Sequence, residues 1–418
     1  MDQRLLNTIR SVCAEPYGFW LDSALPDGRL GTRSFWGAGP AVILRSYRGR
    51  IEIDRQYGPV ERFTGDPFEA LRELLRERAG RGAAVGYLGY GLKRHIERLP
   101  DAATDDLALP ECHIAFYDAV HSADPRLLAP PRPALGLPPA FDGLRSTFTR
   151  EAYERAVRRA LDCIRAGEIY QVNLSQRFEA PCPRDEFDTY LRLRSQAPAP
   201  FGAFLRYPGY AVMSCSPERF LRYEPESRLV ETRPIKGTRP RGPGPRADAA
   251  LAAELLASAK DRAENVMIVD LERNDLGRVA ETGSVHVAGL CELESFPAVH
   301  HLTSTVRARL RPDRDVIDLL RATFPGGSVT GAPKIRAMQI IDEIEPVARG
   351  VYTGAIGYLI PGGAMDLNVA IRTVIARNGV AWFHVGGGVV ADSDPAQEYE
   401  ETLHKGAALA RALLGEGP

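Results

Sequence analysis

One lysine at a constrained turn is the side chain best placed to do chemistry in this sequence. It is Lys236, in the segment TRPIKGTRPRG that spans residues 232–242. Pro234 fixes its own φ and favours extended geometry before it, while Gly237 permits a tight turn or a close approach to a ligand. A buried lysine loses its proton readily, and the neutral amine is a nucleophile. The segment therefore predicts either a nucleophilic lysine or a solvated turn lysine among arginines.

Two carboxylates in other segments have the chemistry to assist such a nucleophile. Glu218 follows a predicted strand over residues 210–215, where apolar neighbours would raise its pKa and make it a general acid; pairing with Arg219 or Arg222 is the alternative. Glu264 lies in a predicted helix over residues 261–277 and shares a face with the apolar Ile268. A carboxylate on an apolar stripe needs a partner, and a metal ion is one possibility.

The last predicted helix carries a second group of charged side chains. Asp394 suits its N-cap and Pro395 its first turn, so Glu398, Glu401 and Lys405 fall on one face. This face suits a divalent ion beside a carboxylate ligand, or else a solvated ion pair.

Three further segments resemble ligand-binding loops to different degrees. Residues 386–388 are three glycines after a predicted strand over 381–385, which indicates either exposed N–H groups for an anion or a close strand crossing. Residues 326–334 have the glycine spacing of a P-loop but lack its Lys-Ser/Thr pair, so we predict a glycine-rich turn close to a ligand. Residues 270–281 lack the turn glycine of an EF-hand, which excludes a calcium loop.

Periodic patterns predict the elements that must position these groups. A helix capped by Thr149 and ended by Gly167 precedes a strand over residues 169–178, which places Gln171, Asn173 and Ser175 on one face. Helices are also predicted from residue 67, over 247–259 and over 335–344, and strands over 41–46, 50–53, 352–359 and 365–373. The chemistry-bearing residues thus fall at strand ends, in turns and on helix faces.

Composition excludes several classes of protein. The 418 residues contain 53 basic and 54 acidic side chains, so the net charge of -1 offers no general field for nucleic acid or an anionic membrane. The six cysteines are far apart and form no Cys-x-x-Cys pair, which predicts reduced, packed thiols. A signal-peptide pattern and a long apolar run are both lacking, so we expect a soluble, cytoplasmic protein.

The segments around these residues resemble those of the chorismate-utilising enzymes, over residues 149–405. The blocks that carry the resemblance are 169–176, 216–218, 234–238, 264–277, 301–304, 324–334, 370–373 and 386–405. Anthranilate synthases resemble this chain but have alanine where Lys236 stands, and isochorismate and salicylate synthases have a lysine base where Gln171 stands. The combination found here resembles that of the aminodeoxychorismate synthase branch of the family. It implies a transaminase-type transferase that makes 4-amino-4-deoxychorismate for p-aminobenzoate and folate synthesis.

The resemblance also implies a role for each site residue. Lys236 would attack C2 of chorismate covalently, Glu218 would protonate the leaving C4 hydroxyl, and His301 matches the family's active-site histidine. Mg²⁺ would bridge a substrate carboxylate to Glu264 and Glu401, with Glu398 beside them. The other implied substrate contacts are Gly237, Thr238, Tyr352, Arg372, Gly386, Gly387, Gly388 and Lys405.

The implied fold is a single large α/β unit with two face-packed β-sheets and helices on the outside. Residues 1–121 would form its N-terminal part, residues 122–145 a proline-rich connector loop, and residues 146–418 the chorismate-binding catalytic part. Residues 19–23 resemble the region where relatives bind tryptophan, although they depart from the usual Leu-Leu-Glu-Ser form. This resemblance predicts a regulatory, tryptophan-type pocket in the N-terminal part.

The resemblance implies a partner as well. The chain has no region left for a glutaminase, so a separate glutamine amidotransferase subunit would deliver ammonia, and a separate lyase would complete p-aminobenzoate. Two alternatives remain at this point. One is anthranilate synthase component I, against which Lys236 argues. The other is a catalytically silent regulatory protein that binds chorismate or tryptophan, against which the complete residue set argues.

Overall fold

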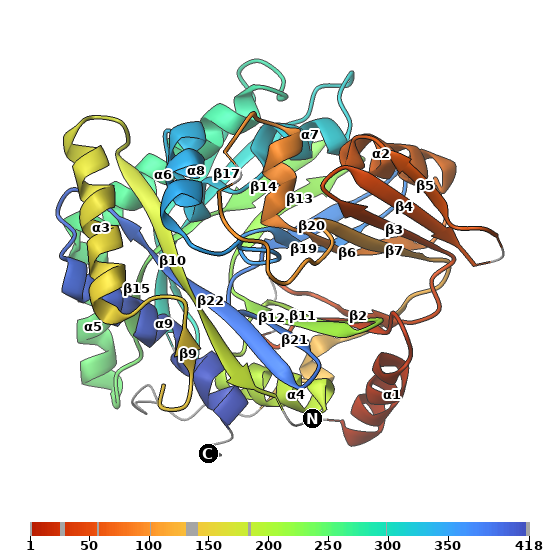
Figure 1. The fold of residues 1–418 in the computed structure, drawn as a ribbon, viewed down its shortest axis with the longest axis horizontal. Helices are drawn as coiled ribbons and strands as arrows, with labels where there is room; N and C mark the ends of the chain where they lie inside the picture. The colour runs from red at the N-terminus through yellow and green to blue at the C-terminus, as the bar shows by residue number, and fades with distance from the viewer. Residues whose placement is uncertain are drawn as a thin grey trace.

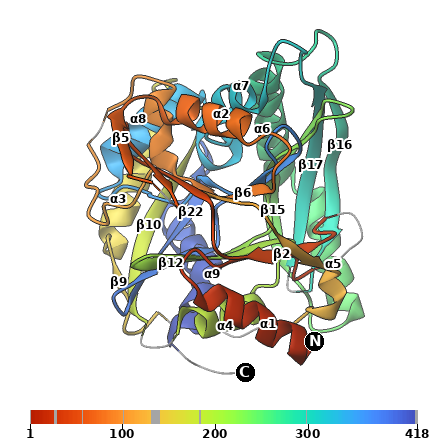
Figure 2. The same ribbon diagram turned by 90° about the vertical axis from the view of Figure 1, so that its right-hand side faces the viewer.

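Two large antiparallel sheets packed face to face form the centre of the molecule in a computed structural model (Figure 2). The structure describes residues 2–25, 30–56, 58–100, 102–130, 141–182, 185–297 and 299–414. The buried layer between the sheets combines Phe19, Leu205 and Val212 of one sheet with Val85 and Ile356 of the other. This arrangement confirms the predicted α/β fold of two face-packed sheets.

The first sheet contains both strands that approach the predicted site from the 169–178 and 381–388 segments (Figure 1). In spatial order its strands are β18 (Gly331–Ala332), β10 (Gln171–Pro181), β22 (Val380–Val389), β21 (Thr373–Arg377), β12 (Tyr210–Ser216), β11 (Phe201–Tyr207), β1 (Phe19–Asp22), β2 (Ser34–Gly37) and β8 (His121–Ala123), and β9 (Arg145–Ser146) pairs with β10.

The second sheet contains the lysine segment at one edge. Its order is β15 (Ile235–Pro240), β17 (Val299–Arg309), β14 (Leu229–Arg233), β13 (Arg219–Glu224), β20 (Met365–Val369), β19 (Ala355–Leu359), β6 (Ala83–Leu88), β7 (Cys112–Tyr117), β3 (Val42–Tyr47), β4 (Arg50–Arg55) and β5 (Glu61–Thr64), and β16 (His286–Ser295) pairs with β17.

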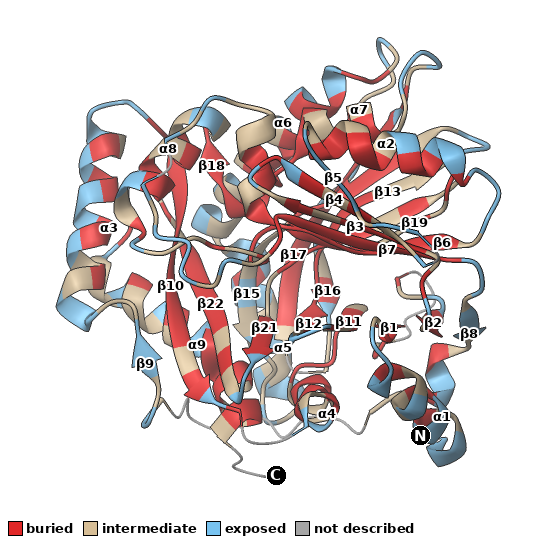
Figure 3. Ribbon diagram, turned by 45° about the vertical axis from the view of Figure 1, so that its right-hand side comes forward, coloured by how far each residue is buried: buried red, intermediate tan, exposed pale blue. Residues whose placement is uncertain are grey.

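Helices cover the outer faces of both sheets (Figures 1 and 3). Those of the described residues are α1 (Gln3–Ala14), α2 (Pro67–Glu77), α3 (Arg150–Arg165), α4 (Glu186–Gln196), α5 (Pro245–Ala257), α6 (Ala259–Gly277), α7 (Val316–Thr323), α8 (Lys334–Ile344) and α9 (Pro395–Leu414), with 3₁₀ turns η1 (Tyr90–His95), η2 (Pro125–Leu127) and η3 (Gly327–Val329). Apolar side chains of α1, α4 and α9 pack on the first sheet, and those of α2, α6 and α7 pack on the second. Burial of one stripe of each helix against a sheet face is the main source of stability for such elements.

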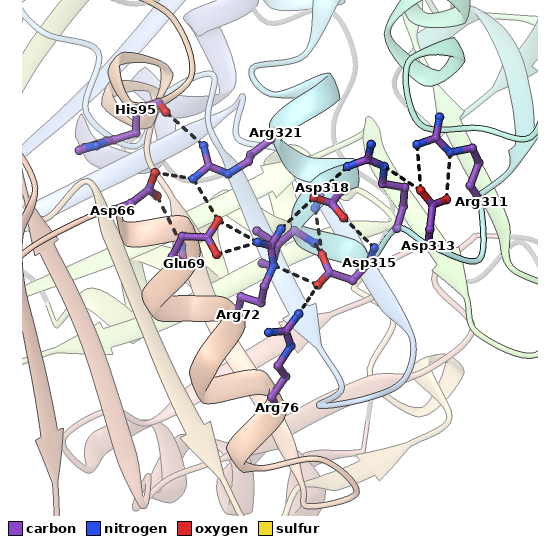
Figure 4. Close-up of polar contacts among 12 residues, drawn as sticks. Asp66, Glu69, Arg72, Arg76, His95, Arg311, Asp313, Asp315, Asp318 and Arg321 are labelled. Carbon is purple, nitrogen blue, oxygen red and sulfur yellow. Dashed lines mark hydrogen bonds and ion pairs between the residues drawn. The ribbon is translucent and has the colours of Figure 1, made fainter.

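Ion pairs join α2 to α7 on the outside of the second sheet (Figure 4). The guanidinium of Arg72 contacts Glu69 at 2.6 Å, Asp318 at 2.9 Å and Asp315 at 3.0 Å, and Arg321 pairs with Asp66. Because Asp66 also caps α2 through the N–H groups of residues 68 and 69, these contacts fix the start of α2 on α7. The network lies outside the predicted site and supports the scaffold.

Several predicted elements are confirmed and three are corrected. The helices that begin after Thr149 and Asp394 start where their caps predict. The strand predicted over residues 352–359 begins only at Ala355, and the strand predicted over 365–373 is broken before Thr373, because Arg372 adopts a positive φ of 49°. The glycines at 386–388 lie within β22 and not beyond it, since they pair with β10.

Residues 1–121 contribute strands to both sheets, as do the residues that follow, so the two parts share one core. Within 122–145, the structure has β8, η2 and the start of β9, whereas residues 131–140 of the predicted connector lie outside the described residues. All six cysteines are buried thiols, as predicted. Among the described helices, none is long and apolar enough to cross a membrane.

Candidate active site

Lys236 lies on β15, which continues the course of β14 along β17 after a break at Pro234, so the turn predicted at the lysine is instead a strand with a register shift before Thr238. Gly237 has a φ of 83°, and a Cβ there would lie 2.9 Å from the Cβ of Asp261, so a larger residue is excluded. The Lys236 amine donates to the carbonyl oxygen of Ser328 at 2.9 Å. Burial lowers the pKa of Lys236, although the carboxylate of Glu264 opposes that change. Burial thus favours the neutral, nucleophilic amine.

Glu218 lies between β12 and β13 and is 4% exposed. Its Oε1 accepts a hydrogen bond from the Ile235 N–H at 3.4 Å, next to Lys236 in the chain. Burial raises its pKa to about 7, against the opposing effects of the Ser328 side chain and of Lys236. A carboxyl group with this pKa retains a proton near neutral pH and suits a general acid. The alternative partner, Arg219, instead pairs with Glu231 at 2.8 Å and Asp366 at 3.0 Å.

Ser328 connects the amine and the acid, and the sequence did not single it out. Its carbonyl accepts from Lys236, and its side chain opposes the rise in the pKa of Glu218. The loop that carries Ser328 is anchored by the Glu272 carboxylate, which accepts from the Gly327 N–H at 3.0 Å, and by Lys334, whose amine donates to two carbonyls of the preceding turn. The glycine spacing at 326–334 predicted a loop close to a ligand, but nothing in it distinguished the serine.

His301 lies on β17 and is kept neutral by its surroundings. It is 2% exposed, its Nδ1 is 2.8 Å from the Thr238 hydroxyl, and its Nε2 has no hydrogen-bond partner within the described structure. Burial, together with the charge of Arg372, lowers its pKa to about 3. His301 is therefore a neutral imidazole at physiological pH, with one ring nitrogen available to a bound molecule.

Arg372 supplies a buried positive charge beside these groups. Its φ of 49° turns the chain between β20 and β21, and burial lowers its pKa while Cys215 and Glu218 act in the opposite direction. Within the described residues, its guanidinium forms no ion pair or hydrogen bond. Arginine stays charged in proteins, so this guanidinium is suited to an incoming carboxylate.

The three glycines of β22 bring backbone close to the site. A Cβ on Gly388 would lie 2.3 Å from Nε2 of Gln171 and 3.5 Å from the Lys236 amine, and one on Gly386 would lie 3.0 Å from the Tyr352 hydroxyl. Since β21 pairs with β22 only as far as residue 383, that edge of the glycine segment is not covered by β21. The glycines thus provide a surface without side chains beside Lys236 and Tyr352.

The three predicted metal-binding carboxylates lie around the glycine strand. Glu264 accepts from Gln171 at 3.0 Å, Glu398 accepts from the Ser393 hydroxyl at 2.6 Å, and Glu401 pairs with Lys405 at 2.6 Å. Burial raises the pKa of Glu264 and of Glu398, and Glu401 raises both further. The Lys405 amine, which also donates to the Gly386 carbonyl at 3.1 Å, lowers the pKa of Glu401.

This donor set has the hard oxygen ligands that magnesium prefers, and Oε2 of Glu398 is buried without a hydrogen-bond partner in the described structure. A Cβ on Gly387 would lie 2.9 Å from that oxygen and 3.7 Å from Oε1 of Glu401, so both carboxylates border the same glycine. In the described part of the chain, however, no three His, Cys, Asp or Glu side chains are close enough together to hold one ion. The donors have the right chemistry but are not preassembled.

Together, these residues place an amine whose pKa is lowered by burial, a carboxyl group whose pKa is raised to about 7 and a buried guanidinium near one another, an arrangement suited to nucleophilic chemistry on an anionic ligand. The family model described as "chorismate binding enzyme" matches residues 19–411, and the chain belongs to this family.

Sequence similarity to known relatives covers most of the chain. The chain is 48% identical to aminodeoxychorismate synthase component 1 of Salmonella typhimurium, over 78% of this chain and 75% of the relative. It is 44% identical to the protein of the same name from Escherichia coli, over 93% of this chain and 92% of that relative. Anthranilate synthase component I from Streptococcus pneumoniae, whose crystal structure is known, has 32% sequence identity to this chain. The structural alignment covers 93% of each chain with a TM-score of 0.79. The similarity thus includes the N-terminal residues as well as the predicted catalytic part.

Proposed function

We propose that this protein is the large component of an aminodeoxychorismate synthase, a transaminase-type transferase that converts chorismate and ammonia into 4-amino-4-deoxychorismate. The observation that carries the proposal is that Glu218 accepts from the N–H of Ile235, next to Lys236 in the chain, where burial lowers the pKa of the amine and raises that of the carboxyl group to about 7. The relatives with this name, at 44% and 48% identity, support the same activity.

The reaction needs both groups in these protonation states. The neutral amine of Lys236 attacks C2 of the chorismate ring, both ring double bonds shift by one position, and the C4–O bond breaks. Glu218 gives its proton to the departing C4 oxygen, which leaves as water. Ammonia then bonds to C4, both double bonds shift back, and the C2–N bond breaks, so that Lys236 is released as the amine. The second attack restores the ring face that the hydroxyl group had occupied.

Cationic side chains within the site must bind the dianionic substrate, because the net charge of the whole chain is close to zero. Arg372 and Lys405 are suited to its two carboxylates, and Tyr352 and the glycines 386–388 to the faces and edges of the ring. His301, neutral and hydrogen-bonded to Thr238, orients the segment after Lys236 and offers Nε2 to the substrate. Gly237 contributes through the close approach of its backbone.

We also propose that Mg²⁺ is held by Glu264 and Glu401, with Glu398 beside them. When bound, the ion supplies positive charge to a substrate carboxylate that would otherwise face three acidic side chains. The unpartnered oxygen of Glu398 supports this assignment, and so does the raised pKa of Glu264 and of Glu398, because such carboxylates are stabilised by a cation.

The ammonia would come from a separate glutamine amidotransferase subunit. The name "component 1" of the relatives supports a partner component, and free ammonium is expected to replace that partner in vitro. The product would supply p-aminobenzoate and folate synthesis. A cytoplasmic location and a tryptophan-type pocket near residues 19–23 remain predictions, although a cavity of about 250 Å³ lined by Leu21, Asp22 and Ser23 does lie between the sheets.

Product identity tests this proposal directly. Purified protein is incubated with chorismate, Mg²⁺ and ammonium at mildly alkaline pH, and the products are separated by liquid chromatography and identified by mass spectrometry. Aminodeoxychorismate is the expected product. Anthranilate or isochorismate would overturn the role of Lys236, and unreacted chorismate, with glutamine and an amidotransferase also supplied, would favour a silent binding protein.

A further inference from the structure

One buried arginine joins the strands and the loop that carry the site. Arg349 follows α8, is 3% exposed, and is flanked by the rings of Tyr90 and Tyr352, whose centroids lie 4.8 and 5.6 Å from its guanidinium carbon. Its Nε and Nη2 donate to the two oxygens of Glu345, at 2.8 and 2.7 Å. This fork-to-fork ion pair is fully enclosed, because Glu345 is 4% exposed.

The other guanidinium donors bind three separate segments. Nη2 donates to the Asn173 carbonyl of β10 at 2.6 Å, and Nη1 donates to the Val329 carbonyl at 3.0 Å and the Thr353 hydroxyl at 3.2 Å. Arginine has five N–H donors in a fixed plane, and these contacts, with the two to Glu345, number five. The geometry thus uses the whole donor set of this side chain.

Each of these segments leads directly to a group of the site. Val329 follows Ser328, whose carbonyl accepts from Lys236 and whose side chain lowers the pKa of Glu218. On β10, Ser175 donates through its N–H and hydroxyl to Oε1 of Glu345, at 2.8 and 2.9 Å. Through these contacts the ion pair sets the distance between β10 and the loop over residues 327–330.

We propose that Arg349, held by Glu345, is a positioning residue that aligns the Ser328 loop, and through it Lys236 and Glu218, with the substrate surface formed by β10 and Tyr352. The inference rests on the proposed roles of Lys236 and Glu218. It adds a residue that touches neither the substrate nor the reacting atoms, and it assigns a function to a buried ion pair that would otherwise be regarded as scaffold.

Lysine cannot replace Arg349 in this role. An ammonium keeps the charge and can pair with Glu345, but it has three donors on one nitrogen and cannot reach β10 and the loop together. In Arg349→Lys the loop loses its register with β10, and displacements of about 1 Å at a reacting group cost on the order of 100-fold in rate. We expect kcat for chorismate consumption to fall by roughly 10- to 100-fold, with KM changed by less than about threefold, because Arg372 and Lys405 are untouched.

A second buried ion pair provides a matched control. Arg194, on α4, pairs with Asp22 at 2.6 and 3.1 Å, is 1% exposed, and contacts the ring of Trp20 at 4.8 Å. Arg194→Lys makes the same change in a similar environment and should lower the melting temperature without altering kcat at temperatures where the protein is folded. An equal loss of kcat in the two variants would show that Arg349 has only a structural role, and this result would overturn the proposal.

A measurement independent of turnover separates this inference from the proposed function. The rate at which trace acetic anhydride labels Lys236, followed by mass spectrometry across a pH series, reports the environment of the amine in each folded variant. Arg349→Lys should shift the pH profile of labelling, and Arg194→Lys should not. If Arg349→Lys fails to fold, Glu345→Gln, which keeps the size of the side chain, should show the same shift. An unchanged profile in the folded variant refutes the positioning role whichever product the enzyme makes.

Discussion

Replacement of Glu218 by glutamine should make the protein more resistant to alkaline pH while it abolishes efficient catalysis. Burial raises the pKa of Glu218 from 4.5 to about 7, so the folded protein keeps a proton there that the unfolded chain has already lost. The stability from this proton is complete below pH 4.5 and is lost as pH rises through 7. At about 1.4 kcal/mol per pH unit, the loss approaches about 3 kcal/mol.

Glutamine keeps the acceptor for the Ile235 N–H but does not ionise, so the variant avoids this loss. Urea unfolding at pH 5 and at pH 8 measures the effect: the free energy of unfolding of the wild type should fall by about 2 to 3 kcal/mol more than that of Glu218→Gln. Loss of the general acid should also reduce kcat by roughly 100- to 10,000-fold.

Glu231→Gln serves as a control of opposite sign. Burial alone would raise the pKa of Glu231, but its hydrogen bond with Arg307 and the charge of Arg219 lower it overall. A carboxylate with a lowered pKa stabilises the fold above its unfolded pKa, so this variant should be less stable than the wild type at pH 8. If Glu218→Gln and the wild type showed parallel pH dependence, Glu218 would not be protonated in the folded protein and could not act as the acid.

Three further outcomes are expected. Lys236→Ala should lose aminodeoxychorismate formation, and a slow gain of anthranilate would show that ammonia now attacks C2; an unchanged product and rate by mass spectrometry would remove Lys236 from the mechanism. Glu264→Ala should raise the Mg²⁺ concentration needed for half-maximal activity at least about tenfold with little change in melting temperature, and an unaltered Mg²⁺ titration would exclude it as a ligand. His301 has a pKa lowered to about 3, so its neutral form stabilises the fold above pH 6.5 and this stability is lost as pH falls towards 3. His301→Gln should therefore lose less stability than the wild type between pH 7 and 4 in thermal melts, and identical acid sensitivity would contradict the assignment.

Much of the scaffold could be predicted from the sequence because local chemistry fixes it. The caps at Thr149 and Asp394 determine where α3 and α9 begin, whatever lies around them. The strand patterns failed where tertiary contacts override the local preference. Arg372 takes a positive φ that its side chain disfavours, and the glycines at 386–388 continue β22 because β10 pairs with them.

The candidate site was less accessible to the sequence because its properties arise between distant segments. The pKa changes of Lys236 and Glu218 depend on burial, which no pattern within either segment reveals. Ser328 acts through a carbonyl that every residue has, and Arg349 acts through contacts with positions 173, 329 and 353. Such roles become visible only once the fold brings the segments together.

The protonation of the site follows from a balance in which burial prevails. Lys236 and Glu218 would attract each other as ions, and each accordingly opposes the pKa change of the other, yet burial still favours the uncharged forms. An arriving dianion would raise the pKa of Lys236 and return it towards the unreactive ammonium. Lys405 opposes that effect, since its charge lowers the pKa of Lys236, and Arg372 lies ready for a carboxylate. Lys405 is therefore expected to do more than bind the substrate, because its charge limits the rise in the pKa of Lys236 that the bound dianion would cause.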